Sequence, residues 1–237
     1  MPGLLLLSLL TTTLPVPKSV AEVEAQLTQA EVVAVDNVAK ACRGSLRLTL
    51  RDHAGVIGRL DGLAREGTPE LKRAILTASR CFRPAAFAST YKRLIADADL
   101  GVVAYALEVV SNTRDVGLVG VVLEYAERTR ESCLTRVDGA ALDACVWAAY
   151  APSTMLEGAS VELRERAAAQ ASAVLEAAAP KVREVAVESL AATKLAAHAS
   201  ALSALIAKER AKGFVANNDA ALIKRFGERL EALKRAK

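Results

Sequence analysis

The chain repeats its own apolar pattern, and this repeat restricts the fold more than any other feature of the sequence. Residues 99–129 hold two apolar runs at helical spacing, joined by a turn-forming cluster, and residues 180–211 repeat the pattern at an offset of 80 residues. When the two segments are aligned at this offset, apolar residues match apolar residues: Val182 aligns with Val102, Ala186 with Ala106, Val187 with Leu107 and Leu190 with Val110. Such an offset equals two units of about 40 residues, which is typical of stacked helix pairs.

Signals for helix starts agree with this division. Asp99 and Asp115 precede the two apolar runs of the first segment and are suited to cap their helices. Residues 68–98 predict another pair, whose helices begin at Pro69 and Pro84, where a missing N–H group costs least.

The remaining segments are less regular. A unit beginning near residue 142 is expected to contain an insertion, and a looser pair is expected near the N-terminus. The expected segments are helices at 30–42 and 51–67 with an extended connection at 43–50, a helix at 142–150, an inserted loop at 151–160, a helix at 160–178 and an amphipathic last helix at 219–236.

Composition favours helices over sheets. Apolar residues make up 52% of the 237 residues and aromatic residues only 4%, so small and medium aliphatic side chains supply the excess. Alanine and leucine are strong helix formers, whereas a sheet protein would be richer in aromatic residues. We expect an all-α fold, a right-handed α-solenoid of about five antiparallel helix pairs with a C-terminal capping helix. This single domain would span residues 22–237, with a basic cap at 213–237.

The best-preserved unit resembles a HEAT repeat. It has a proline, then Val-Arg at Val182 and Arg183, then Ala186, and a second helix after a short turn. The earlier unit has Val103 in place of the arginine, and the unit at 68–98 has a lysine there and is one residue shorter. The resemblance covers residues 68–211, and 22–67 weakly. In this register Arg183 is expected to bridge adjacent turns of the stack.

The resemblance implies a protein-binding role, because the second helices of HEAT arrays generally line a concave, protein-binding face. Charges of both signs are expected to point outward there, which favours a protein partner over nucleic acid. These outward residues are Lys92, Arg93, Glu124, Glu127, Arg128, Arg164, Glu165, Lys208 and Arg210.

We predict no catalytic, metal-binding or cofactor-binding residue. HEAT-like deoxyhypusine hydroxylases hold iron with His-Glu pairs, but neither His53 nor His198 is followed by glutamate. No glycine-rich phosphate loop and no Ser/His/Asp arrangement can be identified. The main hypothesis is a non-enzymatic scaffold for an unidentified protein. A divergent HEAT-fold enzyme with a pocket near residues 147–160 stays an alternative.

Two groups of residues are candidates for partner binding. Trp147 lies in a core register but is the only tryptophan, and Met155 and Leu156 are expected at the exposed tip of the insertion. The last thirty residues, 208–237, carry nine basic and four acidic side chains. Lys224, Arg225 and Arg229 in that region give the second alternative, a nucleic-acid or anionic-surface binder.

The compartment depends on the N-terminus. Residues 1–21 resemble a short signal peptide with an apolar stretch at 4–10, so the protein is periplasmic or secreted if they are one and cytoplasmic otherwise. No run of the sequence is long enough to span a membrane. The cysteines lie in or near apolar runs and are expected as buried free thiols, with a Cys133–Cys145 disulfide as the alternative on export.

Overall fold

The described part of the molecule is built from helices. The computed structural model describes residues 14–44, 46–135, 137–211 and 217–236. Within these ranges it has thirteen α-helices and no strand, which confirms the predicted all-α class. Three 3-10 turns lead into α-helices, at Pro84–Phe87, Val116–Leu118 and Ala196–His198.

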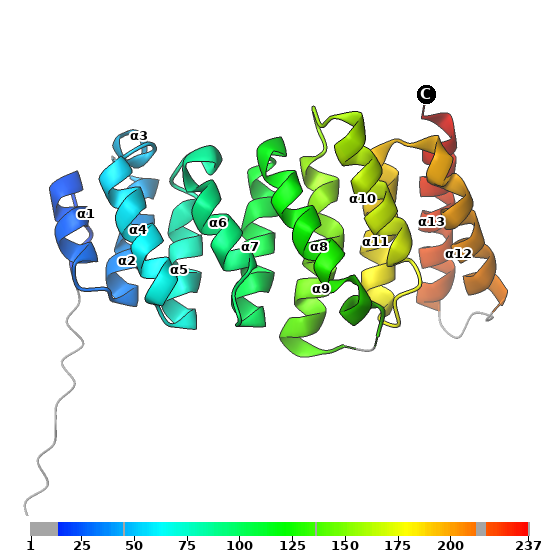
Figure 1. The fold of residues 1–237 in the computed structure, drawn as a ribbon, viewed down its shortest axis with the longest axis horizontal. Helices are drawn as coiled ribbons and strands as arrows, with labels where there is room; N and C mark the ends of the chain where they lie inside the picture. Colours follow the sequence, from blue (N-terminus) through cyan, green and yellow to red (C-terminus); the bar gives the residue numbers. More distant parts are fainter. Residues whose placement is uncertain (1–13, 45, 136, 212–216, 237) are drawn as a thin grey trace, which may run out of the picture.

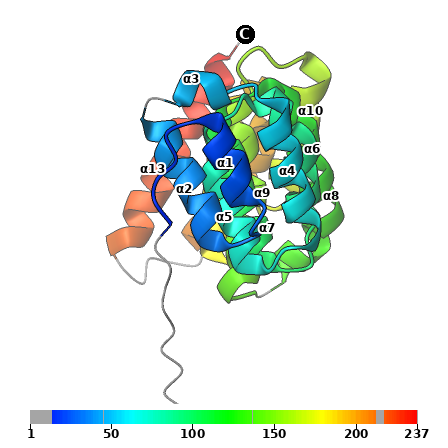
Figure 2. The ribbon, with the colours of Figure 1, turned by 90° about the vertical axis from the view of Figure 1, so that its left-hand side faces the viewer.

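The helices follow one another in chain order along the long axis and form two layers (Figures 1 and 2). Neighbours in the first layer are α2 (Val32–Arg43), α5 (Pro69–Ser79), α7 (Leu100–Thr113), α9 (Gly139–Met155), α11 (Pro180–Thr193) and α13 (Asn217–Arg235). The second layer contains α1 (Val20–Leu27), α4 (Ala54–Glu66), α6 (Ala88–Ile95), α8 (Val119–Leu134) and α10 (Val161–Ala173). The helix α12 (Ala199–Ala211) packs on α13, and a single helical turn, α3 (Arg47–Leu50), follows α2.

The 80-residue repeat is present in the helix boundaries. The helix α7 runs from 100 to 113 and α11 from 180 to 193, and the 3-10 turns and second helices that follow keep the same offset. Arg114 and Lys194, which end the two helices, both adopt the left-handed conformation, with φ of 54° and 57°. The two units therefore fold alike in detail, as their aligned sequences predicted.

Local signals explain where several helices begin. Thr68 accepts a hydrogen bond from Leu71 N at 3.3 Å, and Pro69 occupies the first turn of α5. Asp99 accepts one from Val102 N at 2.8 Å at the start of α7. Asp115 caps the 3-10 turn that leads into α8. The sequence prediction of these starts is confirmed.

Packing between the layers is closest where a second-layer helix is followed by the next first-layer helix, as in α8 with α9 and α10 with α11. The two apolar runs of residues 99–129 form α7 and α8, which a short turn joins and which share one core cluster. The helices α11 and α12 also share a core cluster, and Arg183 of α11 pairs with Glu209 of α12 at 3.4 Å.

Two core clusters meet at α9. Ala144 and Ala148 belong to the cluster that extends back to α1, whereas Val146 and Ala149 belong to the cluster that extends to α13. Small side chains on α9 let the backbones of neighbouring helices approach closely. The last helix buries Ile223, Phe226, Leu230 and Leu233 in the second cluster, so its predicted amphipathic face is confirmed.

The predicted stripe of the 180–192 segment is confirmed. Val182, Ala186 and Leu190 are all 0% exposed. Arg183 bridges as expected: its Nη1 donates to the carbonyl oxygens of Ala177 at 2.7 Å and Ala178 at 3.1 Å. These bonds tie the start of α11 to the segment after α10.

The connection at 43–50 is helical in part, which corrects the expected extended conformation. Leu46 and Leu50 are buried four residues apart, while Leu48 is 82% exposed. A helical turn places residues four apart on one face, and burial of this pair favours α3 over a strand. No helix in the described ranges combines the length and apolar character that a bilayer crossing requires.

Candidate functional site

Trp147, a predicted partner-binding residue, lies on α9 and is only partly exposed. It packs against the larger core cluster, and its ring meets that of Tyr150 edge-on, with 5.7 Å between the centroids. Aromatic pairs of this geometry contribute to packing beyond their buried area. A packing role for Trp147 is therefore present, and its binding role stays a prediction.

Met155 and Leu156 do not form an exposed tip, so this expectation is wrong. The helix α9 continues through Pro152 to Met155, and the exposed fractions of Met155 and Leu156 are 0% and 4%. Thr154 Oγ1 also donates to Ser111 O of α7 at 2.9 Å. Burial of these apolar side chains favours one more helical turn where the sequence suggested a loop.

The basic residues of α13 are partly neutralised within the chain. Arg225 pairs with Glu184 and Arg229 with Glu188, each at 2.8 Å, so both arginines tie α13 to α11. Lys224 is exposed on the same helix. Because α11 lies between α9 and α13, the structure does not bring these cations to Trp147.

Many charged side chains of the second layer form ion pairs within the chain. Three ion pairs join successive helices of this layer and a fourth joins the segment after α10 to α12, each between residues about 30–40 positions apart in sequence. The pairs are Asp61–Arg93, Lys92–Glu124, Glu127–Arg166 and Glu176–Lys208. Many of the charges that were expected to point at a partner therefore link neighbouring helices.

Asp61 is the centre of the most connected of these pairs. Its carboxylate accepts hydrogen bonds from Thr90 at 2.7 Å, Arg93 at 2.6 Å and Arg65 at 3.0 Å. Burial raises the pKa of Asp61, but these three hydrogen bonds lower it by more, so the net pKa lies below its ordinary value. The charged form of Asp61 thus stabilises the junction of α4 and α6.

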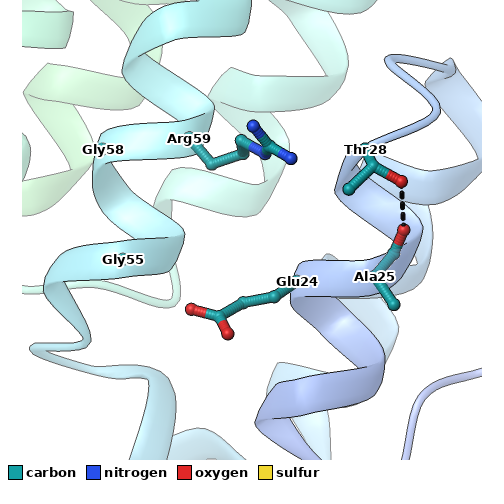
Figure 3. A pocket seen from close by; sticks show the side chains of 6 residues that line it. All are labelled: Glu24, Ala25, Thr28, Gly55, Gly58 and Arg59. Carbon is teal, nitrogen blue, oxygen red and sulfur yellow. Dashed lines mark hydrogen bonds between the residues drawn. The ribbon is translucent and has the colours of Figure 1, made fainter.

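A depression of about 600 Å³ lies between α1 and α4 (Figure 3). Glu24 of α1 and Arg59 of α4 extend into it from opposite sides, and Gly55 and Gly58 form part of the α4 wall. A Cβ at Gly55 would lie 2.5 Å from the Glu24 carboxylate. The absence of a side chain there leaves room for the Glu24 carboxylate beside α4.

A second depression, of about 690 Å³, continues along α4. It shares Gly58 and Arg59 with the first and extends past Gly62 to Glu66 and Leu71. A Cβ at Gly58 or at Gly62 would meet no atom within 4 Å, so both positions face open space. We call the two depressions together the α4 groove.

The sequence carried a signal for this groove that was not used. Gly55, Gly58 and Gly62 are three and four residues apart, which puts them on one face of the predicted 51–67 helix. Glycine inside a helix costs about 1 kcal/mol relative to alanine. Three such residues on one face therefore mark a place where exposed helix backbone is retained at a cost in stability.

The two histidines have structural partners. His53 Nδ1 accepts a hydrogen bond from Val56 N at 3.3 Å at the start of α4, and it lies 3.8 Å from Glu24. His198 lies 3.4 Å from the Ser172 hydroxyl. Among the described residues, no three His, Cys, Asp or Glu side chains are grouped closely enough to hold a metal ion.

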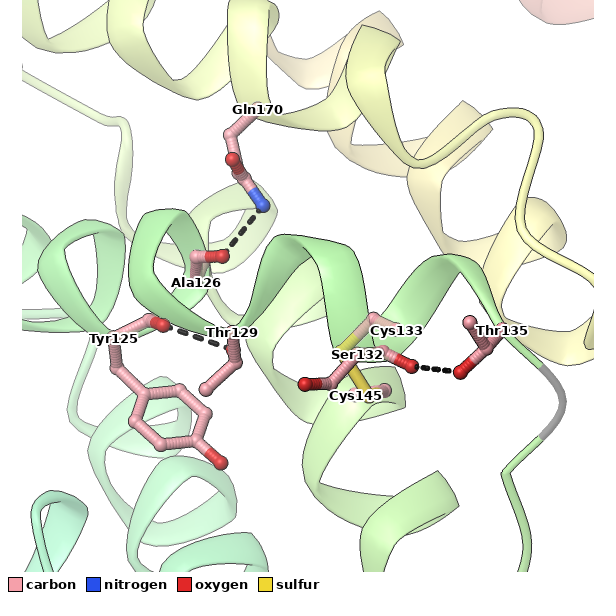
Figure 4. The surroundings of a disulfide bond; sticks show 8 residues. All are labelled: Tyr125, Ala126, Thr129, Ser132, Cys133, Thr135, Cys145 and Gln170. Atoms are coloured by element: carbon pink, nitrogen blue, oxygen red, sulfur yellow. Dashed lines mark hydrogen bonds between the residues drawn. A yellow bond between two sulfur atoms is a disulfide. The ribbon is translucent and has the colours of Figure 1, made fainter.

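The four cysteines form two disulfides, so the expectation of free thiols is wrong. Cys133 at the end of α8 is joined to Cys145 of α9, the alternative pairing considered for an exported chain (Figure 4). Cys42 of α2 is joined to Cys81, just after α5, with 5.7 Å between the Cα atoms. The second pair is separated by 39 residues in sequence and links the C-terminal end of α2 to the residues that follow α5.

The junction beside the Cys133–Cys145 disulfide is also held by hydrogen bonds. Gln170 of α10 donates to Ala126 O of α8 at 2.8 Å (Figure 4), and its own oxygen accepts from Arg130 Nε at 3.2 Å. Gln170 is 5% exposed, so these bonds satisfy a buried amide.

No protein-family model matches the chain. No curated protein matches it significantly either.

Proposed function

We propose that the chain is a HEAT-like, right-handed α-solenoid that acts as a non-enzymatic scaffold and binds a protein partner. The 80-residue repeat in sequence and in helix boundaries supports the repeat architecture. The arrangement supports it further, since the described helices follow one another in chain order in two layers and α13 comes last. Arg183, which sits where HEAT units carry an arginine, links its unit to the preceding segment.

The α4 groove is the observation that carries the binding proposal. It is an elongated depression where helix backbone is exposed at Gly58 and Gly62, and where charges of both signs stand on the walls. A partner helix or extended segment gains close backbone approach and polar contacts in such a groove. Elsewhere in the second layer the charged side chains are already paired within the chain, so they are less available for contacts with a partner.

A side chain placed in the groove tests this assignment. Gly58→Gln should raise the free energy of unfolding by about 0.5–1 kcal/mol, because glutamine has the higher helix propensity. The same change should block the partner, since the new side chain occupies the groove. Affinity capture and quantitative mass spectrometry with extracts of the native host would compare this variant with the unaltered chain.

Gly120→Gln is the matched control, because Gly120 also lies in a helix and faces open space, but on α8. The Gly120→Gln variant should show the same gain in unfolding free energy and should still bind the partner. The scaffold proposal would be abandoned if the unaltered chain retained no protein in stoichiometric amount. Equal retention by both variants would move the binding site away from α4.

The alternative of a nucleic-acid or anionic-surface binder has less support. Its candidate arginines, Arg225 and Arg229, are engaged by glutamates of α11. Salt-sensitive binding of DNA or acidic vesicles that disappears when Lys224, Arg225 and Arg229 are neutralised would favour this alternative. A divergent enzyme is supported by no arrangement of groups near residues 147–160.

Export to an oxidising compartment is part of the proposal. Two disulfides in a chain of this size are typical of periplasmic or secreted proteins. The apolar stretch at 4–10 that suggested a signal peptide lies outside the described residues. Mass spectrometry of the mature protein should find the N-terminus removed and all four cysteines oxidised.

A further inference from the structure

A second concave site lies at one end of α2 and α5, apart from the α4 groove. It has a volume of about 400 Å³, and it shares no lining residue with the groove. Its walls contain three arginines, one threonine and one of the disulfides: Arg43, Arg47, Arg80, Thr77, Cys42 and Cys81. We call it the arginine pocket.

The charges of the arginine pocket have no ion-pair partner among the residues that the structure describes. None of Arg43, Arg47 and Arg80 makes an ion pair or a side-chain hydrogen bond with a described residue, and no carboxylate is among the lining residues. Nearby arginines behave differently, since Arg73 pairs with Glu70 and Arg83 with Asp52. Three exposed side chains of like charge line one depression, and an anion in the pocket would be attracted by all of them.

The Cys42–Cys81 disulfide organises the pocket. Arg43 directly follows Cys42, and Arg80 directly precedes Cys81, so the bridge brings the two arginines together from different helices. Arg47 approaches from α3. Thr77 closes the wall, but its hydroxyl already donates to Arg73 O at 3.1 Å and lies 2.9 Å from the Tyr105 hydroxyl. Recognition in the pocket therefore depends on the arginines.

We propose that the arginine pocket binds a tetrahedral oxyanion, the phosphate or sulfate group of a monoester. Guanidinium groups donate paired hydrogen bonds that match such oxyanions. A carboxylate offers two acceptor oxygens in one plane, whereas the phosphate or sulfate group of a monoester offers three terminal oxygens to donors on three sides. The pocket is an open depression bordered by α2, α3 and the end of α5, which differs from the long basic stripe that nucleic acid requires. This site does not depend on the proposed scaffold role.

Titration of the disulfide-intact chain with inorganic phosphate and with inorganic sulfate tests the proposal. NMR signals of the arginine Nε–Hε groups and calorimetry would follow binding, with chloride at matched ionic strength as the reference. We expect saturable binding at one site that shifts the signals of Arg43, Arg47 and Arg80. Loss of each arginine should weaken the affinity about tenfold.

The triple variant Arg43→Gln, Arg47→Gln and Arg80→Gln should abolish the binding. A control variant with the same loss of charge replaces three exposed cations outside the pocket by glutamine. These cations are Lys181, Lys224 and Arg235. The control should bind as the unaltered chain does. Absence of saturable binding by the unaltered chain, or an equal loss in both triple variants, would overturn the proposal.

A third arm examines the bridge. Cys42→Ala with Cys81→Ala keeps all three arginines and should weaken phosphate binding severalfold, with circular dichroism used to establish that the helices remain. Unchanged affinity in this variant would overturn the organising role of the disulfide. Phosphoserine and tyrosine sulfate then distinguish the two sources of the oxyanion, and tighter binding of one of them identifies the natural ester.

Discussion

At the residue scale, Asp61 shows how a carboxylate joins two helices of the second layer. Its side chain is only 16% exposed and accepts three hydrogen bonds, two of them from α6. A buried carboxylate is costly unless such partners compensate its charge. The lowered pKa of Asp61 indicates that they do, which links the stability of the α4–α6 junction to pH.

Asp61→Asn should therefore destabilise the protein in a pH-dependent way. The folded-state pKa lies below the unfolded value of about 3.9, so the carboxylate stabilises the fold above that pH and the contribution disappears as the pH falls through the folded-state pKa. We expect a loss of about 1–3 kcal/mol in unfolding free energy at neutral pH. Urea denaturation from pH 7 to pH 3 should show the difference between the two proteins shrinking below about pH 4. A difference that is constant with pH would contradict this account of Asp61.

At the element scale, α7 and α11 end with the same set of bonds. Thr113 Oγ1 donates to Val110 O and Thr193 Oγ1 to Leu190 O, both at 2.7 Å. Each hydroxyl oxygen also accepts a backbone N–H two residues later, at 3.2 and 3.3 Å. The two helix ends are thus built alike, although their flanking sequences differ.

Thr113→Val and Thr193→Val should have matching effects. Each removes a hydroxyl that donates one hydrogen bond and accepts another, although Thr193 is fully buried and Thr113 only partly, and each should lower the unfolding free energy by about 1 kcal/mol. Because α9 separates the two helices, the losses in the double variant should add to within about 0.5 kcal/mol. Chemical denaturation of the three variants measures this, and a loss at only one site would show that the two units are not equivalent.

At the scale of the whole molecule, the disulfides join adjacent helix pairs into one body. The Cys42–Cys81 bridge closes a loop of 39 residues near one end, and the Cys133–Cys145 bridge closes one of 12 residues in the middle. Both restrict the unfolded chain, and the longer loop restricts it more. The first bridge thereby stabilises the end of the molecule that carries both the α4 groove and the arginine pocket.

Replacing both cysteines of a bridge by alanine should cost about 2–4 kcal/mol in unfolding free energy. Loss of the Cys42–Cys81 bridge should cost about 1 kcal/mol more than loss of Cys133–Cys145, because its loop is longer. Denaturation with and without reductant measures both values, and the variants should differ from the unaltered chain only without reductant. The reverse order would show that loop length does not set the contribution of these bridges.

The sequence by itself determined the helical class, most helix boundaries, the helix caps and the buried stripes. These features depend on contacts between residues three or four apart, which a periodic pattern records directly. Asp99, Pro69 and the apolar face of residues 180–192 are cases in which local chemistry was sufficient. The 80-residue repeat also predicted that two units fold alike, since their apolar residues share one pattern.

Only the tertiary structure decided which helices pack closest, which cysteines meet and which charges stay unpaired. These outcomes depend on residues about 40 positions apart, and local periodicity carries no information on their distance. Met155 is an example. The proline three residues before it led to the prediction of a loop, yet Met155 is buried and lies in α9. The arginine pocket is another, because its three arginines come together where α2, α3 and the end of α5 meet.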